Sequence, residues 1–469
     1  MKRFLSLCYL LTGLTLYAAC TSGNADPCET NPQPGCPNYV DPCIADPQPG
    51  CPNYTDPCEI DPQPGCPNYT DPCEIDPQPG CYNYDVAPTL ATTITLGATP
   101  YTVDETEMDE FENGFWYLKA RLTNATNPLV IHAVRYNIHT TGYRIEAWSG
   151  RDSLSGKETP LTMVNRYEAA NRQVKVTING GFYGMETTGV PTDAEIVKGM
   201  MNCLGNNESP IVGFDENNYP YIDYLTFNSK VKSKNAVEFN ITNVNSTRWE
   251  DWLVLYNSAK GKRTGTNEWG TEILCAPKTG QWETLNTHIG VRCNVEQKEL
   301  MNGNGNMTIP KGKIILSGNS KANTYLTNYL QVGDEVEVTV DYALASSPAV
   351  NSTVIRNAVS GSNIILKNNE ALEPPTTEGL YTSKHPRTAI GFSAAKDFVY
   401  FVVVEGRHTG SVGVTTKELA QVMLYLGATD AINLDGGGSS CLMIGKTTKN
   451  VLSDGSQRAV CNGLAIIKN

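Results

Sequence analysis

The sequence predicts an α+β fold: a strand-rich mixed-sheet domain with few helices, in which a C-terminal strand–helix–strand unit carries the candidate site. Three observations lead to this prediction. Apolar and polar residues alternate through much of the chain after residue 86, which is the period of a half-buried strand. Helical spacing with clear start and stop signals marks one segment, 415–427. Short apolar runs flank that segment on both sides.

The first segment of the chain, residues 1–19, is typical of an export signal. A positively charged start precedes an apolar stretch that is short for a membrane span and ends in small residues. The tripeptide Ala-Ala-Cys ending at Cys20 resembles a bacterial lipoprotein cleavage site, in which the cysteine is lipidated. An ordinary signal peptide with an incidental Cys20 is the alternative. We therefore expect a cell-envelope protein, lipid-anchored at the periplasmic or cell-surface face of the outer membrane.

Residues 20–85 form a Cys- and Pro-rich spacer of four 15-residue repeats. The repeats begin at Asp26, Asp41, Asp56 and Asp71, and each holds two cysteines but few aliphatic side chains, so little core can form. In an oxidising compartment the eight thiols are expected to form four disulfides, with one bridge per repeat as the simplest pairing. We favour a stapled, semi-rigid spacer over a metal-binding array, because zinc sites need reduced thiolates in tetrahedral sets.

The net charge of −13 is concentrated near the N-terminus. Residues 26–85 hold eleven acidic and no basic side chains, which leaves −4 for residues 86–469. No basic stripe is present to neutralise a phosphate backbone. The sequence therefore predicts no nucleic-acid partner.

From residue 86 the composition becomes that of a folded domain, and we predict one domain over 86–469 with a strand-rich elaboration at 205–375. The stretch 86–180 alternates apolar and polar residues and is expected to form strands. The segment 333–340 alternates cleanly, which suits a half-buried strand.

One helix is clearly marked near the C-terminus. Thr415 and Glu418 form a capping box, apolar residues then recur at helical spacing, and Gly427 ends the helix as a C-cap residue.

Two predicted strands flank this helix and each ends at a carboxylate. The run 398–404 precedes Glu405, and the run 431–434 precedes Asp435. A strand–helix–strand arrangement delivers both carboxylates to one edge of a sheet.

The run Asp-Gly-Gly-Gly that starts at Asp435 is the strongest local signal. Three consecutive glycines weaken a fold, so they usually mark a place where the chain passes close to another group. We expect the amides of Gly436, Gly437 and Gly438 to face an anionic ligand, with Asp435 at the entrance. A flexible turn is the alternative.

Two arginines lie in neighbouring polar motifs, His385-Pro386-Arg387 and Glu405-Gly406-Arg407. The planar guanidinium fork suits phosphate. A surface ion pair is the alternative for each arginine, and a loop histidine with a satisfied hydrogen bond is the alternative for His385.

Five motifs of the chain occur in the order seen in the phosphodiester glycosidase family. They are NGGFY from Asn179, HPRTAIG from His385, VVVEGRHTGSVGVTTKEL from Val402, NLDGGGSS from Asn433 and RAVCNGLAI from Arg458. The chain resembles this family over about residues 90–469, most closely over 385–467. The family includes the mammalian enzyme that uncovers mannose 6-phosphate by removing N-acetylglucosamine.

The resemblance implies a hydrolase that cleaves the glycosidic bond of a sugar-1-phosphodiester, similar to a GlcNAc-1-phosphodiester, and releases free sugar and a phosphomonoester. Asp435 or Glu405 would activate water or act as nucleophile, and His385 would relay a proton. The expected substrate- or phosphate-binding residues are Asn179, Arg387, Thr388, Arg407, Gly436, Gly437, Gly438, Ser439 and Asn462. Six residues are expected to line one pocket: Asn179, Arg387, Glu405, Arg407, Asp435 and Asn462.

The chain departs from the family pattern at three places. The glycine-rich stretch before HPRT is reduced to residues 359–362, and the Cys-rich repeat is no part of the family. Cys441 and Cys461 lie near the two C-terminal motifs, where we expect a disulfide.

A metal-dependent phosphodiesterase that breaks the P–O bond is the second enzyme hypothesis. Such enzymes usually hold metals with several Asp and His side chains. The chain has five His, none at a spacing such as i, i+4. We therefore expect no resident cofactor, while a single bound cation stays open. A non-catalytic, glycan-binding or adhesin lipoprotein is the alternative from another class, but it leaves the clustered Arg, Glu and Asp unexplained.

Overall fold

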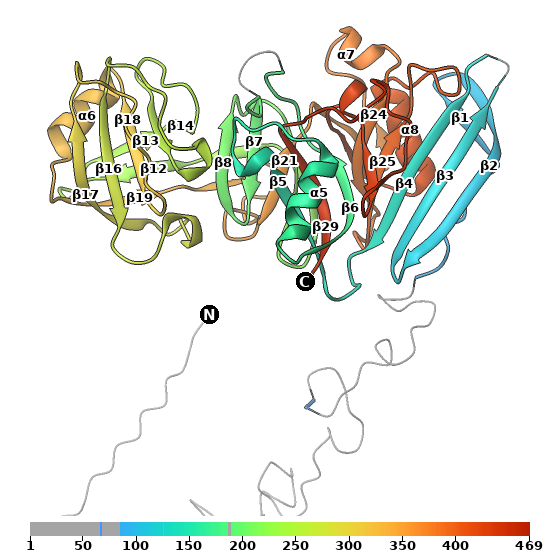
Figure 1. Cartoon of the computed structure of the whole chain (residues 1–469), viewed down its shortest axis with the longest axis horizontal. Coiled ribbons are helices and arrows are strands. Elements are labelled where there is room, and N and C mark those ends of the chain that lie inside the picture. The colour runs from blue at the N-terminus through green and yellow to red at the C-terminus, as the bar shows by residue number, and fades with distance from the viewer. Residues whose placement is uncertain (1–65, 68–84, 125, 186–188) are drawn as a thin grey trace, which may run out of the picture. The chain divides into compact units, whose positions relative to one another are not determined.

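The computed structural model describes residues 66–67, 85–124, 126–185 and 189–469, and every element named below lies in these ranges (Figure 1). The predicted signal peptide, the lipidation site Cys20 and most of the repeats lie outside the described residues, so the expectations for them stay predictions. Cys66, which is described, is disulfide-bonded. Residues from Gly80 to Asn469 form one compact unit. Within the described ranges, no helix has the length and apolar character needed to cross a bilayer.

The fold is strand-rich with few helices, which confirms the predicted α+β class. The largest sheet of the described residues has nine strands, in the order β1 (Thr93–Leu96), β2 (Thr99–Glu112), β3 (Phe115–Thr123), β4 (Leu129–Asn137), β25 (Phe398–Val404), β24 (Arg387–Phe392), β26 (Asp430–Asn433), β22 (Asn363–Lys367) and β23 (Glu370–Ala371). Segments from both ends of the unit thus meet in one sheet, because β4 pairs with β25.

Two five-stranded sheets lie beside it in Figure 1. One runs β28 (Thr447–Thr448), β27 (Leu442–Ile444), β6 (Gln173–Asn179), β29 (Asn462–Lys468) and β5 (Tyr143–Ser149). The other runs β10 (Pro220–Asp223), β9 (Ile211–Phe214), β21 (Asn357–Ser360), β7 (Asp193–Val197) and β8 (Met200–Gly205).

Within the predicted elaboration, 205–375, residues 229–339 form an eight-stranded sheet at the opposite end of the unit from β2 (Figure 1). Its order is β13 (Glu238–Ile241), β12 (Ser229–Lys232), β19 (Glu335–Thr339), β17 (Val291–Glu299), β16 (Thr271–Pro277), β18 (Ile314–Gly318), β15 (Leu253–Tyr256) and β14 (Asn243–Val244). A two-stranded sheet, β11 (Leu225–Phe227) with β20 (Tyr342–Leu344), joins it to the rest. The strands β9, β10, β21, β22 and β23, also within 205–375, belong to the other sheets. Burial alternates along β19, as the sequence predicted.

The helices of the described residues are α5 (Pro160–Ala169), α6 (Lys321–Tyr329), α7 (Gly379–Thr382) and α8 (Thr416–Leu426). Helix α8 has the predicted capping box, since Thr415 and Glu418 exchange side-chain and backbone hydrogen bonds, and Gly427 ends it in a left-handed conformation (φ 101°). Leu419, Val422 and Met423 on its inner face are fully buried. They pack on one face of the nine-stranded sheet, while the other face packs against β5, β6 and β29. The nine-stranded sheet is therefore covered on both sides where the candidate site lies.

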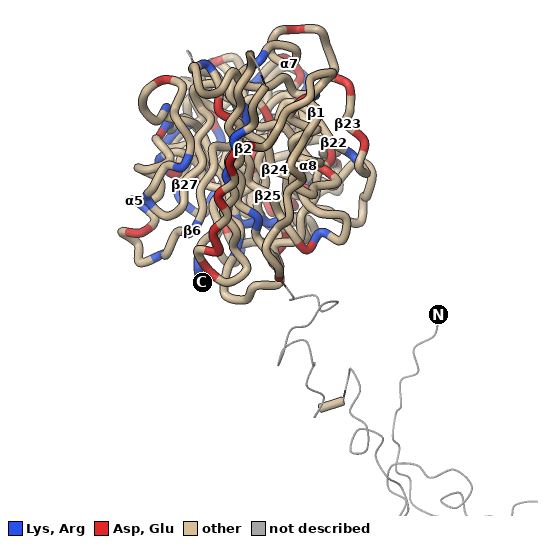
Figure 2. The backbone as a smooth tube through the Cα atoms, turned by 90° about the vertical axis from the view of Figure 1, so that its right-hand side faces the viewer, with Lys and Arg blue, Asp and Glu red and all other residues tan. Residues whose placement is uncertain are grey.

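The outer part of this sheet is acidic. Asp104, Glu105, Glu107, Asp109 and Glu110 are exposed along β2, and Figure 2 shows them as a row along that strand. A charged exposed strand resists edge-to-edge pairing with another molecule.

Candidate functional site

The candidate site lies at one edge of the nine-stranded sheet, where three of its strands begin or end. Strand β24 lies between β25 and β26 and is antiparallel to both. Its first residue, Arg387, pairs with Val404, so Glu405 follows on the neighbouring strand at the same edge. Asp435 comes two residues after β26 ends, again at this edge. The predicted strand–helix–strand unit is therefore confirmed as β25–α8–β26, with β24 inserted between its strands.

The three glycines after Asp435 let this loop pass close to other groups. A Cβ on Gly436 would lie 2.8 Å from the carbonyl oxygen of Pro386, and one on Gly437 would lie 3.0 Å from Nη2 of Arg407. Gly437 also has a left-handed φ of 61°. A Cβ on Gly438 would collide with the ion pair of Asp454 and Arg458.

Two backbone amides of this loop already donate hydrogen bonds to oxygens of the protein. The Gly436 amide donates to Oδ1 of Asp435 (2.9 Å), and the Gly437 amide donates to the carbonyl oxygen of Pro386 (2.8 Å). These two bonds hold the loop against the start of β24. An anion would reach the Gly436 and Gly437 amides only by competing with them.

Asp435 is the half-buried carboxylate of the site. Its backbone is fixed at both ends, since its amide donates to Gly180 O (3.1 Å) and its carbonyl accepts from Asn179 Nδ2 (2.7 Å). Burial raises the pKa of Asp435 to about 6, and the nearby Ser439 hydroxyl and Arg458 guanidinium oppose this shift. A carboxylate with this pKa exchanges protons near neutral pH, as acid–base catalysis requires.

Arg387 and Arg407 bring two positive charges to the same edge. Arg387 is 2% exposed, and its Nε and Nη2 donate to the carbonyl oxygens of Val414 (3.0 Å) and Ser383 (2.9 Å). Burial and the Arg407 charge lower the pKa of Arg387 to about 10, so it stays protonated at neutral pH. Arg407 is exposed and holds a left-handed φ of 65°. Within the described residues neither arginine has a carboxylate partner.

His385 lies next to both arginines. Its Nδ1 is 3.3 Å from Nη2 of Arg407 and accepts a hydrogen bond from it. Burial, together with the charges of Arg387 and Arg407, lowers the pKa of His385. The imidazole is therefore neutral at pH 7, with its proton on Nε2.

Glu405 is buried and fully occupied by protein groups. Its Oε1 accepts from His132 Nε2 (2.8 Å) and the Val451 amide (2.6 Å), and its Oε2 accepts from His408 Nε2 (3.1 Å). The Tyr117 hydroxyl donates in turn to Nδ1 of His132 (2.8 Å). Although burial by itself raises the pKa of Glu405, the bonds from His132 and Val451 and the nearby His408 hold it below its ordinary value. Glu405 is thus an ionised anchor for the loop that carries Arg407.

Asn179 and Thr388 join the sheet with β6 to the nine-stranded sheet. Asn179 Oδ1 accepts from the Thr388 hydroxyl (2.9 Å) and the Cys441 amide (3.1 Å), and the Thr388 hydroxyl lies 3.1 Å from that of Ser440. Asn179 and Thr388 are both 0% exposed. They hold the Asp435 loop in place from behind.

Asn462 has a similar role on the other side of Gly180 and Gly181. Its Oδ1 accepts from the Gly181 amide (2.8 Å) and its Nδ2 donates to Oε2 of Glu195 (2.8 Å). Glu195 is 0% exposed, and burial raises its pKa. Asn179, Thr388, Asn462 and Glu405 are therefore buried in protein contacts. The solvent-accessible members of the predicted set are His385, Arg407, Asp435, Gly436 and Gly437.

The sequence analysis missed several residues that shape this site. Arg458 stands in a quoted motif, but its ion pair with Asp454 (2.6 Å) over the glycine loop was not foreseen. His132 and Glu195 carried no local signal, because their partners Glu405 and Asn462 are 273 and 267 residues away.

The expected disulfide between Cys441 and Cys461 is absent, so that expectation is wrong. All five cysteines after residue 85 are buried free thiols. The Cys461 thiol donates to the Gly181 carbonyl oxygen (3.8 Å), while Cys441 has Thr448 beside it. Among the described residues no group of three or more His, Cys, Asp or Glu side chains converges as metal ligands would.

Comparison with known proteins identifies the relatives of this chain. Residues 286–467 match the family model described as phosphodiester glycosidase. The SPbeta prophage-derived uncharacterized protein YomE of Bacillus subtilis (strain 168) is 40% identical over 83 residues, which are 18% of this chain and 13% of YomE. The chain thus matches a small part of the length of that relative.

Two solved structures share the fold. A hypothetical protein from Synechocystis superposes with a TM-score of 0.62 and 16% identity, covering 78% of this chain and 64% of that one. A Burkholderia pseudomallei protein described as exported superposes with a TM-score of 0.56 and 18% identity, covering 73% of this chain and 75% of that one. At these identities the likeness establishes the fold alone.

Proposed function

Since residues 286–467 belong to the phosphodiester glycosidase family, we propose that this chain hydrolyses the glycosidic bond of a sugar-1-phosphodiester. The substrate would be similar to a GlcNAc-1-phosphodiester, and the products would be the free sugar and a phosphomonoester. The observation that carries the proposal is the pair Arg387 and Arg407, which stand together without a carboxylate partner among the described residues.

Two adjacent cations without a counter-ion are costly, more so where one is buried. Removing the partner of a buried charge typically destabilises a protein by about 3–5 kcal/mol. Arg387 is 2% exposed and its pKa is lowered by burial and by Arg407. A phosphate diester placed between the two guanidinium groups would offset this repulsion through charge-assisted hydrogen bonds. The neutral Nε2–H of His385 adds a further donor on the same side.

Asp435 is the better of the two candidate carboxylates for direct chemistry. It is half-buried, and burial raises its pKa to about 6, so it is largely ionised at pH 7 but close to its titration. Glu405 has both oxygens occupied by His132, His408 and the Val451 amide. We therefore assign the role of catalytic carboxylate, as nucleophile or general base, to Asp435 and a positioning role to Glu405.

In the proposed reaction the bond between the anomeric carbon and the phosphate oxygen breaks, and its electron pair leaves with the phosphate. An oxocarbenium-like transition state forms, which Asp435 stabilises either by adding to the anomeric carbon or by taking a proton from attacking water. The oxygen of water ends on the sugar. Arg387 and Arg407 stabilise the charge that develops on the departing phosphomonoester.

Hydrolysis of the methyl diester of N-acetylglucosamine-1-phosphate in ¹⁸O-labelled water tests this proposal. We expect the label in the released sugar and none in the phosphomonoester. Asp435→Asn should lower kcat by several orders of magnitude, while Arg121→Gln on the exposed side of β3 should leave it unchanged. Label in the phosphate would identify P–O cleavage and contradict the proposal. So would the absence of sugar release from this and other sugar-1-phosphodiesters by the folded protein.

We further propose that the chain is exported and anchored through a lipid on Cys20. The support is the sequence of residues 1–20, with its charged start, apolar stretch and Ala-Ala-Cys ending. Metabolic labelling with radioactive palmitate in a bacterial host should mark the full chain, and Cys20→Ser should abolish the label. Equal labelling of both forms would contradict the anchor.

A further inference from the structure

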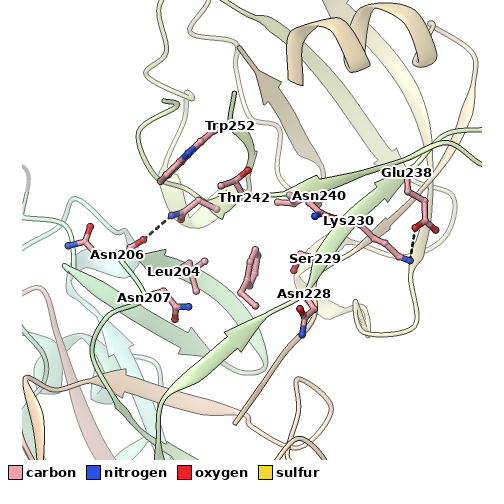
Figure 3. Close-up of a pocket in the computed structure, with 14 residues that line it drawn as sticks. Leu204, Asn206, Asn207, Asn228, Ser229, Lys230, Glu238, Asn240, Thr242 and Trp252 are labelled. Carbon is pink, nitrogen blue, oxygen red and sulfur yellow. Dashed lines mark hydrogen bonds and ion pairs between the residues drawn. The ribbon is translucent and has the colours of Figure 1, made fainter. Parts of the chain in front are cut away.

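A recess lies where β8 meets the eight-stranded sheet, and its lining includes neither Arg387 nor Arg407. It has a volume of about 740 Å³, within the usual range for small-molecule sites. One wall comes from the segment after β8, with Asn206 and Asn207, and the other from β12, β13 and the residue before β15. We call this recess the carboxamide pocket, after Asn206, Asn207, Asn228, Asn240 and Asn243 in its lining (Figure 3).

The walls of the carboxamide pocket are held by hydrogen bonds within the protein. Asn243 Nδ2 donates to the carbonyl oxygen of Gly205 (2.8 Å), which ties β14 to the end of β8. Asn207 Nδ2 donates to the carbonyl oxygen of Leu225 (3.3 Å). These two carboxamides are structural, and they fix the opening without a ligand.

Three other asparagines in the lining form no hydrogen bond that holds the walls together. Asn206, Asn228 and Asn240 are exposed, and their side chains make no hydrogen bond with any described residue. Each carries an unused carbonyl acceptor and an NH₂ group with two donors. They come from both walls, and Figure 3 shows them around the opening. Their chemistry suits a ligand with many hydroxyl or amide groups.

Aromatic side chains supply the apolar part of the lining. Phe227 and Trp252 both line the pocket and both are partly exposed. The loop that carries Trp252 also carries Trp249, which is 61% exposed, and the two are linked by a backbone hydrogen bond (3.2 Å). Aromatic side chains that gather at an exposed surface suit binding, because a Trp ring offers an apolar face with a polar N–H at its edge.

The charge at the pocket is balanced. Lys230 Nζ and Glu238 Oε2, both in the lining, form an ion pair (2.9 Å). Each of the two side chains is 42% exposed. No further charged side chain lines the pocket. This differs from the candidate site at the edge of the nine-stranded sheet, where Arg387 and Arg407 lack a carboxylate partner among the described residues. A phosphate or a uronate would find no unpaired cation in the carboxamide pocket.

From these observations we propose that the carboxamide pocket binds a neutral stretch of an oligosaccharide. The faces of Trp252 and Phe227 contact the apolar faces of the sugar rings, while Asn206, Asn228 and Asn240 bind their hydroxyl or acetamido groups. The site is separate from the arginine pair and does not rest on the proposed hydrolysis.

Calorimetric titration of the full chain with chitotetraose, cellotetraose and mannotetraose tests this inference, with tetragalacturonate as the anionic counterpart. We expect at least one neutral tetrasaccharide to bind. The double variant Asn228→Ala/Asn240→Ala should weaken that binding at least tenfold, and Asn206→Ala on the opposite wall should weaken it separately. Asn328→Ala, an exposed asparagine on α6 outside the pocket, serves as the control and should bind like the unmodified chain.

Three results would overturn the inference: no binding of any neutral tetrasaccharide, unchanged binding in the Asn206 and Asn228/Asn240 variants, or tighter binding of tetragalacturonate. Because the side chains of these asparagines are exposed and form no hydrogen bonds within the described residues, we expect the variants to fold. Thermal unfolding of each variant verifies that it is folded. Asp435→Asn should bind the tetrasaccharide normally. Binding that survives in this variant separates the pocket from the catalytic proposal, whatever the outcome of the hydrolysis assay.

Discussion

Arg387 and Arg407 make the candidate site a place that is short of negative charge. Asp435 and Glu405 do not compensate them by direct contact, since Asp435 accepts from the Gly436 amide and Glu405 from two imidazoles and an amide. The negative charge missing from the site is what a phosphate would bring.

Inorganic phosphate should therefore stabilise the folded protein. A ligand at about one hundred times its Kd adds about 2.7 kcal/mol to the free energy of unfolding, so the melting temperature should rise by a few degrees. Arg387→Gln and Arg407→Gln should abolish most of this rise, and Arg121→Gln should retain it. Differential scanning calorimetry with and without phosphate measures the effect. An equal rise in all four proteins would show that phosphate acts elsewhere.

The charge of Arg458 should be visible in the pH dependence of hydrolysis. Because Arg458 favours the ionised form of Asp435, Arg458→Gln should raise the pKa of Asp435 above about 6. Ionised Asp435 is the active form, so activity rises with pH through this pKa. The acidic limb of the kcat/KM profile should thus move to higher pH, with little change on the plateau. A profile that only drops in height would mean that Arg458 acts in another way.

Glu405 should contribute to stability in a pH-dependent manner. Its pKa in the folded protein is lower than in the unfolded chain. Its stabilising effect is therefore fully present above the unfolded pKa of about 4.3 and is lost as pH falls through the lower folded pKa. Because the hydrogen bonds from His132, His408 and the Val451 amide are to an ionised group, Glu405→Gln should cost about 1.5–3 kcal/mol at pH 7 and less at pH 3. Urea unfolding at both pH values measures this. A cost that does not shrink at pH 3 would contradict an ionised Glu405.

At the scale of the elements, the glycine loop shows how backbone geometry serves the site. Gly437 combines a left-handed φ with close contact to the Arg407 guanidinium. Gly445 has a left-handed φ of 52° as well, but a Cβ there would meet nothing within 4 Å. A side chain at either position would strain the backbone, but only one at Gly437 would also crowd a neighbouring side chain.

Gly437→Ala and Gly445→Ala should both lose stability by about 1 kcal/mol, because both place alanine in a left-handed conformation. Only Gly437→Ala should also push the Arg407 side chain aside and lower kcat/KM, by at least tenfold. Comparing unfolding and kinetics of the two variants tests this. Similar kinetics in both would mean that Arg407 tolerates displacement.

The elements that the sequence predicted best are those with local signals. Helix α8 and strand β25 follow from a capping box and a continuous apolar run, and both have the expected bounds within a residue. Helix α5 was not predicted, although Thr159 caps it and Pro160 opens it, because only Pro160, Met163 and Val164 are buried and its apolar pattern is weak. The strand-rich fold class could be predicted from the alternation of apolar and polar residues alone.

The site was predictable only where the motif is local. Asp435, Arg387 and Arg407 were named from short runs, and the structure brings them to one edge. The role of Glu405 depends on His132, which reaches it by pairing of β4 with β25. Neither segment contains a local sequence pattern that predicts this long-range contact. The sequence analysis therefore predicted a catalytic role for Glu405 and did not predict that it anchors the Arg407 loop.

At the scale of the whole molecule, the compact unit begins before residue 86. Asp85 and the carbonyl oxygen of Val86 both accept from Arg135, which is 6% exposed and stacks over the Phe398 ring. The end of the spacer thus supplies the counter-charge of a buried arginine in β4.

A chain that starts at residue 80 should therefore be more stable than one that starts at residue 88. Loss of Asp85 leaves Arg135 buried without its partner, at a cost of about 3–5 kcal/mol. Urea unfolding of the two chains measures the difference, and Arg135→Met in the shorter chain should recover part of it. Equal stability of the two chains would show that water replaces Asp85.

Strand β29, the last seven-residue strand of the chain, lies in the interior of its sheet between β5 and β6. Pairing with strands made some 300 residues earlier gives the fold a high contact order, which slows folding. During synthesis, β5 and β6 cannot complete their sheet until β29 has been made, and Asn462 at the start of β29 contacts Gly181 only then. A chain that lacks β29 therefore also lacks the hydrogen bond between Asn462 and Gly181 that supports the candidate site from behind.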